Sequence, residues 1–213
     1  MFITLEGIEG SGKSTQIENI VAFLKARGYE CVTSREPGGT EIGAQIRGVL
    51  LDPRNSDMDP TVELLLYTAD RVQHIRNVIQ PHLAAGRVVI CDRYFDATMV
   101  YQGYARGLDK EMIRSLHQLA CGGLQPDLTL LFDLEPHLGL ERAWRQINRG
   151  GRTQKETRFE QEKLDFHQAV RDGYLDMARL APDRFRIIAA DQSPQAVAHS
   201  IEGVLATVLP QKK

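Results

Sequence analysis

The chain has few cysteines and no apolar run long enough to cross a membrane. Its 213 residues include three cysteines, Cys31, Cys91 and Cys121, which lie far apart in the sequence. A disulfide framework is therefore not expected. The cysteines are expected to be buried thiols of a protein in a reducing compartment. No stretch of about 18 apolar residues occurs, and the N-terminus has no basic segment followed by an apolar one. These absences predict a cytoplasmic protein with no membrane partner.

The charges are nearly balanced, and the histidines show no metal-ligand spacing. Lysine and arginine number 26 against 28 aspartates and glutamates, which gives a formal net charge of −2. Such a chain has no overall attraction for polymeric nucleic acid or for a membrane surface. The six histidines are not paired with each other or with cysteine as in a zinc site. With 42% hydrophobic and 25% charged residues, one compact domain is expected over residues 1–213.

The N-terminal segment contains a phosphate-binding loop. An apolar strand over residues 2–5 runs into Gly7-x-x-x-x-Gly12-Lys13-Ser14, and a helical pattern follows. The glycines let successive N–H groups face an anion, Lys13 reaches the β- and γ-phosphates, and Ser14 ligates Mg²⁺. The alternative, a plain glycine-rich turn, is disfavoured because every fixed position matches in this context. The predicted ATP-binding residues are Gly7, Glu9, Gly10, Ser11, Gly12, Lys13, Ser14 and Thr15.

Strand-like apolar segments alternate with helical patterns along the rest of the chain. Strands are expected at about 31–33, 88–91, 128–133 and 185–189. Helices are expected at about 40–50, 60–80, 109–120, 137–149, 156–180 and 194–208. This alternation predicts an α/β fold of the phosphate-loop NTPase kind, with a doubly wound, five-stranded parallel sheet flanked by helices. Ligands of such folds bind beyond the carboxyl ends of the strands.

Two segments offer groups for a second substrate. Arg35 begins the loop Arg-Glu-Pro-Gly-Gly-Thr at the end of the second strand, where a guanidinium suits a phosphate and a surface role is equally consistent. Tyr67 and Arg71 lie four residues apart on one face of the 60–80 helix and could bind a planar base. The pattern alone favours a core tyrosine beside an exposed arginine. This helix is apolar on two faces, which indicates a subunit contact.

The buried-type strand at 88–91 ends in a carboxylate, Asp92. This residue is a predicted Mg²⁺ ligand, directly or through water, with a surface turn as the alternative. Arg93 follows at the place where a second phosphate would lie. Thr98, Tyr101 and Gln102 lie on a predicted helix, and their hydroxyl and amide groups could read the edge of a base.

An arginine-rich stretch surrounds the pair Gly150-Gly151. A solvated face is one interpretation of this charge run. The other is a mobile lid over about 142–160 with a glycine hinge, which closes arginines over the transferring phosphoryl group and excludes water. Glu160 and Glu162 follow, and they could join the metal shell or face solvent. The basic residues of the stretch are Arg142, Arg145, Arg149, Arg152, Lys155 and Arg158.

Taken together, these motifs resemble the bacterial thymidylate kinase family across essentially the whole chain. The resemblance implies transfer of the γ-phosphoryl group of ATP to dTMP, with dTDP as product, Mg²⁺ as cofactor and a homodimer as the assembly. The segments that carry it are LEGIEGSGKST, REPGGT, LLLYTADRVQ, DRYFDATMVYQG, PDLTLLFDLEP and the arginine-rich stretch.

The resemblance also assigns roles to the acceptor residues. It implies that Glu9 contacts the deoxyribose 3′-hydroxyl and an acceptor arginine, and that Arg35 and Arg93 hold the dTMP phosphate. Tyr67, where the family usually has phenylalanine, would stack under thymine. Arg71 would donate to a thymine carbonyl, which reverses the preference drawn from the pattern alone.

Three further substrate-binding roles follow from the same resemblance. Thr98 and Gln102 would lie at the edge of the base. Tyr101 would close beneath C2′ of the sugar and exclude a ribose hydroxyl.

One departure from the family pattern concerns catalysis. Gly10 stands where some members carry a catalytic arginine, so the resemblance places that charge in the lid. The lid is longer than in the shortest members, which leaves the catalytic arginine open, while Arg142 and Arg145 are expected on the preceding helix. The predicted catalytic residues are Glu9, Lys13, Arg93, Arg149, Arg152 and Arg158.

Two other functions share the phosphate loop. A kinase of deoxynucleosides or other small metabolites needs a base for its hydroxyl acceptor, and Glu36 is the only nearby candidate. A nucleotide-dependent switch is the second, but neither Asn-Lys-x-Asp nor Asp-x-x-Gly occurs in the chain. The phosphate of dTMP is already an anion near neutral pH and needs no base.

Overall fold

A five-stranded parallel sheet forms the centre of the molecule. The structure is a computed structural model of the whole chain and describes residues 1–150 and 154–211. The strand order is β2-β3-β1-β4-β5. The strands are β1 (Phe2–Glu6), β2 (Cys31–Arg35), β3 (Val88–Asp92), β4 (Leu128–Asp133) and β5 (Phe185–Ala189). The predicted doubly wound α/β fold is confirmed.

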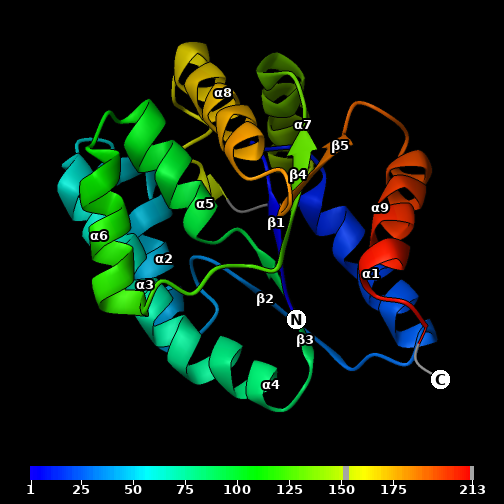
Figure 1. Cartoon of the computed structure of the whole chain (residues 1–213). Helices are drawn as coiled ribbons and strands as arrows, with labels where there is room; N and C mark the ends of the chain where they lie inside the picture. Colours follow the sequence, from blue (N-terminus) through cyan, green and yellow to red (C-terminus); the bar gives the residue numbers. More distant parts are fainter. Residues whose placement is uncertain (151–153, 212–213) are drawn as a thin grey trace.

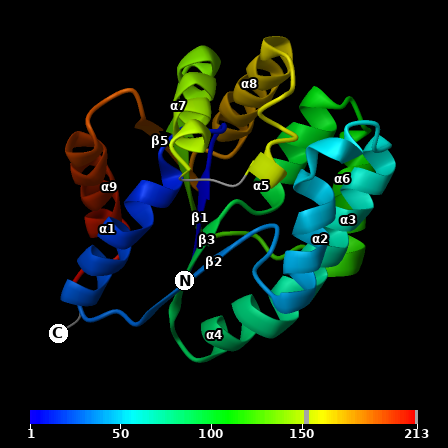
Figure 2. The same cartoon turned by 180° about the vertical axis from the view of Figure 1, so that it is seen from behind.

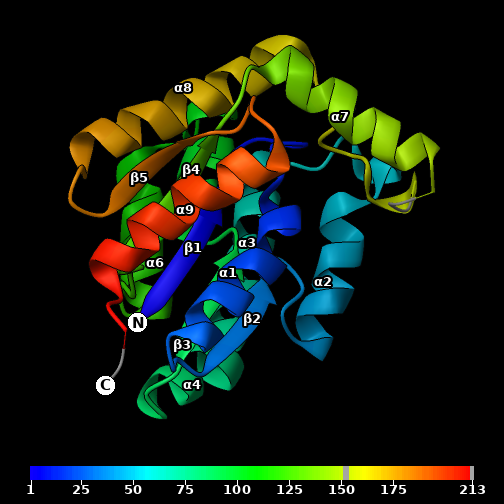
Figure 3. The same cartoon turned by 90° about the vertical axis from the view of Figure 1, so that its right-hand side faces the viewer.

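Helices cover both faces of this sheet (Figure 1). α1 (Lys13–Ala26) packs against α9 (Pro194–Val208), and Figure 2 shows this pair at the opposite end of the molecule from α2 and α3, which contact each other. α7 and α8 also contact each other and run across the top of the view in Figure 3. Within the described residues, no helix has both the length and the apolar character needed to cross a bilayer. The remaining helices are α2 (Glu41–Leu51), α3 (Pro60–His74), α4 (Gln80–Ala84), α5 (Phe95–Thr98), α6 (Lys110–Cys121), α7 (Pro136–Asn148) and α8 (Leu164–Leu180).

The strand registers bring the predicted site segments to one edge of the sheet. Every residue of β1 is buried, as expected of a central strand covered on both faces. Leu5 of β1 and Arg35 of β2 both pair with Asp92 of β3. The phosphate loop after β1, the loop after β2 and the end of β3 therefore lie side by side.

The helix predicted at 60–80 extends further than expected. Asp59 caps it by accepting a hydrogen bond from the Thr61 N–H at 2.7 Å, and Pro60 occupies its first turn. α3 then continues through a π-helical turn, η2 (Ile75–Ile79), into α4. A second π-helical segment, η3 (Met99–Ala105), follows α5, so the predicted helix around Tyr101 is present.

The prediction of one helix over 156–180 is wrong at its beginning. A short 3₁₀ turn, η4 (Gln154–Glu156), precedes an irregular segment, and α8 begins at Leu164. The four consecutive residues at 157–160 are all buried. A helix on the surface of a domain cannot bury four residues in a row, because they point in four directions around its axis. These residues instead form a hydrogen-bonded turn, in which the Gln161 N–H donates to the Thr157 carbonyl oxygen at 3.2 Å.

Candidate active site

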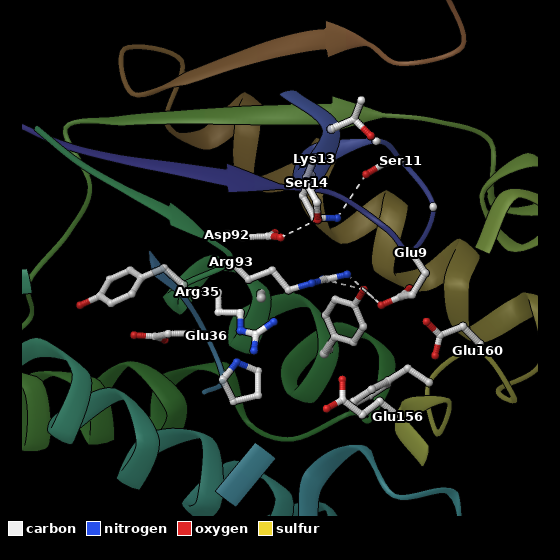
Figure 4. Close-up of a pocket in the computed structure, with 18 of the residues that line it drawn as sticks. Glu9, Ser11, Lys13, Ser14, Arg35, Glu36, Asp92, Arg93, Glu156 and Glu160 are labelled. Carbon is white, nitrogen blue, oxygen red and sulfur yellow. Dashed lines mark hydrogen bonds and ion pairs between the residues drawn. The ribbon is translucent and has the colours of Figure 1, made fainter. Parts of the chain in front are cut away.

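A cavity of about 810 Å³ lies beyond the carboxyl ends of the strands. Figure 4 shows side chains from the phosphate loop, β2 and β3 directed toward it. Among the described residues, Gly7, Arg149 and Arg158 are the predicted site residues that do not line it. Those that do are Glu9, Gly10, Ser11, Gly12, Lys13, Ser14, Thr15, Arg35, Tyr67, Arg71, Asp92, Arg93, Thr98, Tyr101 and Gln102.

The phosphate loop packs backbone to backbone against α7. Gly10 has a φ of 70°, and a Cβ added to it would lie 2.0 Å from the carbonyl oxygen of Gly139. A Cβ added to Gly139 would in turn lie 2.5 Å from the carbonyl oxygen of Glu9. A side chain at position 10 would force α7 to move. This contact is a physical reason for glycine where the resemblance led us to consider arginine.

Lys13 is folded back onto its own loop. Its Nζ donates to the carbonyl oxygens of Gly7 at 3.0 Å and Ile8 at 2.9 Å, and to the Ser11 hydroxyl at 3.2 Å. Burial and the positive charge of Arg93 lower the pKa of Lys13 to about 8. A bound triphosphate would favour the charged ammonium, and Lys13 would exchange its bonds to the loop for bonds to phosphate oxygens.

Ser14 and Asp92 form the candidate metal site. Ser14 Oγ donates to Asp92 Oδ2 at 3.1 Å, while the buried Oδ1 has no hydrogen-bond partner among the described residues. The described part of the chain contains no group of three or more histidine, cysteine, aspartate or glutamate side chains placed to hold a metal. Mg²⁺ commonly binds one or two carboxylates together with waters and substrate phosphates. A single carboxylate and a hydroxyl facing a phosphate loop therefore fit Mg²⁺.

Arg93 is fixed at the end of β3 by a triangle of hydrogen bonds. Its φ of 66° is left-handed, which costs roughly 1–2 kcal/mol for a residue with a side chain. Nη2 donates to Glu9 Oε1 and Nη1 to the Tyr101 hydroxyl, both at 2.8 Å. The Tyr101 hydroxyl donates to the same Glu9 oxygen at 2.6 Å. The guanidinium is thus oriented before any ligand binds.

Glu9 is an ionised carboxylate in this arrangement. Burial by itself would raise its pKa, but Arg93, His167 and Tyr101 outweigh that effect and hold the pKa of Glu9 well below its usual range. His167, on α8, is 1% exposed, and its Nδ1 lies 3.3 Å from Glu9 Oε2. Glu9 therefore connects the phosphate loop to β3, η3 and α8.

Arg71 is a buried cation at the far end of the cavity. Its Nε donates to Glu36 Oε2 at 2.8 Å, and its Nη2 donates to the Thr98 hydroxyl at 2.8 Å. The other oxygen of Glu36 lies 2.8 Å from His74 Nδ1. Arg71 is only 2% exposed, so the exposed arginine favoured by the sequence pattern alone is wrong. Both oxygens of Glu36 are engaged.

The other residues predicted for the acceptor site also line the cavity. Tyr67 is partly buried, burial and the charge of Glu63 raise its pKa, and its hydroxyl has no hydrogen-bond partner in the described ranges. Gln102 Nε2 donates to Glu63 Oε1 at 2.7 Å. Arg35 is exposed at the end of β2, and Figure 4 shows it on the side of the cavity where Arg93 projects.

The arginines predicted for the lid have different surroundings. Arg149 ends α7 and is exposed, whereas Arg152 lies outside the described residues. Arg158 Nη2 donates to Glu63 Oε2 at 2.5 Å, and its Nε donates to the Leu50 carbonyl oxygen at 2.5 Å. Arg158 is therefore held against α3, with 2% of its side chain exposed.

Flanking residues of this stretch also contribute to the site. Arg142 and Arg145 lie on α7 as predicted, and Arg142 lines the cavity at the end nearer β5. Glu160 is buried and lines the cavity. Glu162 forms an ion pair with Arg106 at 2.6 Å.

Comparison with known proteins decides the family. The thymidylate kinase family profile matches residues 5–201. The chain belongs to the thymidylate kinase family. A thymidylate kinase of Desulfosudis oleivorans is 58% identical over 190 residues, 89% of each chain. Thymidylate kinases of Nitratidesulfovibrio vulgaris and Solidesulfovibrio magneticus are 50% and 48% identical over 98% of this chain, and over 93% and 100% of their own.

Sequence reasoning missed several buried charged or polar residues of this thymidylate kinase family site. Glu63 has a readable signal, since it lies four residues before Tyr67 and eight before Arg71, on the same face of α3. His74 and His167 carry no such signal. Each lies in an ordinary amphipathic helix, and their partners Glu36 and Glu9 are distant in sequence.

Proposed function

We propose that the chain transfers the γ-phosphoryl group of ATP to dTMP, giving dTDP and ADP, as a step toward dTTP. The observation that supports this best is the engagement of Glu36, whose two carboxylate oxygens bond Arg71 and His74. A hydroxyl acceptor needs a base, and Glu36 was the candidate for it. A phosphate acceptor needs only positioning and charge stabilisation.

Different residues of the described part would bind the phosphoryl donor and the acceptor. Lys13 would leave the loop carbonyls and donate to the β- and γ-phosphates. Arg93, held by Glu9, and Arg35 would bind the acceptor phosphate between the two ends of the cavity. Tyr67 would lie against thymine, with Arg71 donating to a base carbonyl. The acceptor oxygen would attack in line with the bond to ADP.

Ser14 and Asp92 would hold Mg²⁺ together with the donor phosphates. The ion would neutralise charge that accumulates on the β- and γ-oxygens. We further propose that residues 142–160 act as a lid and that Arg149 or Arg152 supplies the positive charge missing at position 10.

A homodimer in the cytoplasm completes the proposal. Exposed apolar side chains recur at one face of α2 and α3, which pack side by side. Cys91 and Cys121 are buried thiols that form no disulfide, which suits a reducing compartment.

Product analysis tests the reaction. The purified chain is incubated with ATP and Mg²⁺, with dTMP, with thymidine, or with no acceptor. Of the three incubations, only the one that contains dTMP is expected to give product, as equal amounts of dTDP and ADP. Phosphorylated thymidine would support the metabolite kinase instead, and ADP formed equally without acceptor would support a nucleotide-dependent switch.

A further inference from the structure

A chain of buried hydrogen bonds continues behind Arg71, away from the cavity. Glu36 Oε1 lies 2.8 Å from His74 Nδ1, and His74 Nε2 lies 2.6 Å from the Ser34 hydroxyl. The side chains of His74 and Glu36 are 0% and 2% exposed. Nothing in the proposed reaction uses Ser34 or His74.

The direction of the bond between His74 and Glu36 is fixed by chemistry. A carboxylate only accepts, so His74 Nδ1 must carry the hydrogen whichever way the ring is protonated. A neutral ring accepts at Nε2 from the Ser34 hydroxyl, and a charged ring donates to it. In both states the ring is held between the two partners and directs one oxygen of Glu36.

The loop after β2 seals this arrangement. A Cβ added to Gly39 would lie 2.6 Å from His74 Cδ2 and 2.7 Å from Ser34 Oγ, so the backbone lies directly on both side chains. The Gly38 N–H donates to Asp70 Oδ1 at 3.0 Å one turn before His74. The His74 ring is closed to bulk solvent, and its two nitrogens bond to Glu36 and Ser34.

Arg71 depends on Glu36 for its orientation. Its guanidinium has three fixed contacts, through Nε to Glu36 and through Nη2 to Thr98 and to the Tyr94 carbonyl oxygen at 3.3 Å. The bond to the ionised Glu36 is the charge-assisted one and is therefore the strongest. Arg71 also lines the cavity, so if Glu36 rotates, the guanidinium loses its charge-assisted partner and the donors it presents to the cavity can change direction.

We propose that His74, braced by Ser34, is a positioning residue for acceptor recognition, acting on the base through Glu36 and Arg71. This inference deepens the proposed function and rests on it. A purely structural histidine would affect folding without a specific effect on the acceptor.

The test compares His74→Phe with His74→Asn and Ser34→Ala. Phenylalanine keeps the ring and removes both hydrogen bonds, whereas the asparagine amide can still donate near the position of Nδ1. The KM for dTMP is expected to rise at least about tenfold in His74→Phe, less in Ser34→Ala, and to recover to within about threefold of the original in His74→Asn. The KM for ATP and kcat are expected to change less than about twofold.

The matched control is His117→Phe. His117 is also a buried histidine, 5% exposed, and its Nε2 bonds to the Leu124 carbonyl oxygen rather than to Glu36 or Ser34. Its ring stacks on Phe95, a contact that phenylalanine keeps. This variant is expected to lose stability with the KM for dTMP unchanged.

A double-mutant comparison shows whether His74 acts through Arg71. In an Arg71→Ala background, His74→Phe is expected to change the Kd for dTMP less than about twofold, because the group it orients is gone. An effect of equal size in both backgrounds, or an unchanged KM in folded His74→Phe and Ser34→Ala proteins, overturns the inference while leaving the proposed function standing. If His74→Phe does not fold, Ser34→Ala decides alone. Failure of the unmodified chain to bind and phosphorylate dTMP overturns both.

Discussion

Glu6 is a carboxyl group with no exposure, at the end of β1 beneath the site. It accepts hydrogen bonds from the Tyr94 N–H at 2.8 Å and the Tyr174 hydroxyl at 2.6 Å. Burial and the nearby charge of Asp96 raise the pKa of Glu6 to about 8. Glu6 is therefore protonated over much of the neutral range, unlike Glu9 three residues later.

This difference predicts a pH dependence of stability. A carboxyl group whose pKa is raised from 4.5 to about 8 on folding contributes fully below pH 4.5 and progressively less up to pH 8. Glu6→Gln mimics the protonated form and should not lose stability in this way. The free energy of unfolding of the original chain should therefore fall relative to that of the variant by up to about 1.4 kcal/mol per pH unit between pH 5 and 8. Urea unfolding at several pH values measures it. Parallel pH profiles for the two chains would show that Glu6 is ionised throughout.

Tyr101 combines two functions that one further pair of variants can separate. Its hydroxyl belongs to the triangle with Glu9 and Arg93, and its ring lines the cavity. Tyr101→Phe should lower turnover and retain the preference for dTMP over the ribonucleotide, because the ring remains. Tyr101→Ala should narrow that preference by roughly 10- to 150-fold in kcat/KM, because the buried 2′-hydroxyl is no longer penalised.

The kcat/KM ratio for the two acceptors measures this effect. Equal ratios in Tyr101→Ala and the original chain would remove the ring from sugar selection.

At the scale of elements, the segment at 157–163 joins α3 to α8 through buried charges. Arg158 bonds Glu63, which also bonds Gln102 and has no exposed surface. One carboxylate thus ties the end of the predicted lid to the helix that carries the base-site residues. Removing one partner of such a pair leaves a buried charge behind.

Variants at Arg149 and Arg158, the two described candidates for the catalytic arginine, should therefore behave differently. Arg158→Ala should lower the free energy of unfolding by about 3 kcal/mol, because Glu63 loses a buried partner. Arg149→Ala, at an exposed position, should leave stability within about 0.5 kcal/mol. If Arg149 is the catalytic arginine, its variant should lower kcat by about 10³-fold with dTMP binding retained.

Chemical unfolding and steady-state kinetics on both proteins check these outcomes. Full kcat in Arg149→Ala would leave Arg152 as the candidate. Arg106 Nε also lies 3.4 Å from Glu63 Oε1, so a stable Arg158→Ala protein would show that Arg106 alone can balance the charge of Glu63.

The elements that sequence predicted well are those with a local signal. The phosphate loop has fixed glycine spacing, and β4 is mostly apolar and fully buried up to Phe132, so both follow from short segments. The prediction of a helix over 157–160 was wrong because this segment is buried by contacts with α2 and α3, about 100 residues away in the sequence. The left-handed conformation of Arg93 and the hydrogen bonds of His74 likewise depend on partners distant in sequence, which periodicity does not encode.

For the whole molecule, the apolar residues left on the surface are informative. Ile42 and Val49 of α2 and Val62 and Leu65 of α3 are 45–53% exposed, at spacings of seven and three residues on their helices. Those spacings place each pair on one helical face, which is the pattern of a helix-to-helix subunit contact. Val62 and Leu65 belong to one of the two apolar faces predicted from the sequence of α3, and this face is exposed.

A charge in this face should disrupt the proposed homodimer. Leu65→Glu is expected to yield a monomer, because a carboxylate would be buried without a partner in the interface. Leu180→Glu, 72% exposed at the end of α8, is the matched control and should leave the assembly unchanged. Light scattering after size-exclusion chromatography measures the mass. A monomeric original chain, or a dimeric Leu65→Glu protein, would contradict this assignment.

Asp92 and Arg93 are neighbours in sequence, so a single peptide unit joins the carboxylate proposed to hold Mg²⁺ to the guanidinium proposed to bind the acceptor phosphate. If Asp92 holds Mg²⁺ as proposed, a bound nucleotide would act on the same backbone that holds Arg93 at a φ of 66°. Thermodynamic linkage then requires reciprocity. If the nucleotide changes the affinity for the acceptor by some factor, the acceptor changes the affinity for the nucleotide by the same factor. The two substrates of this chain should therefore share one coupling free energy, measurable at equilibrium from either side.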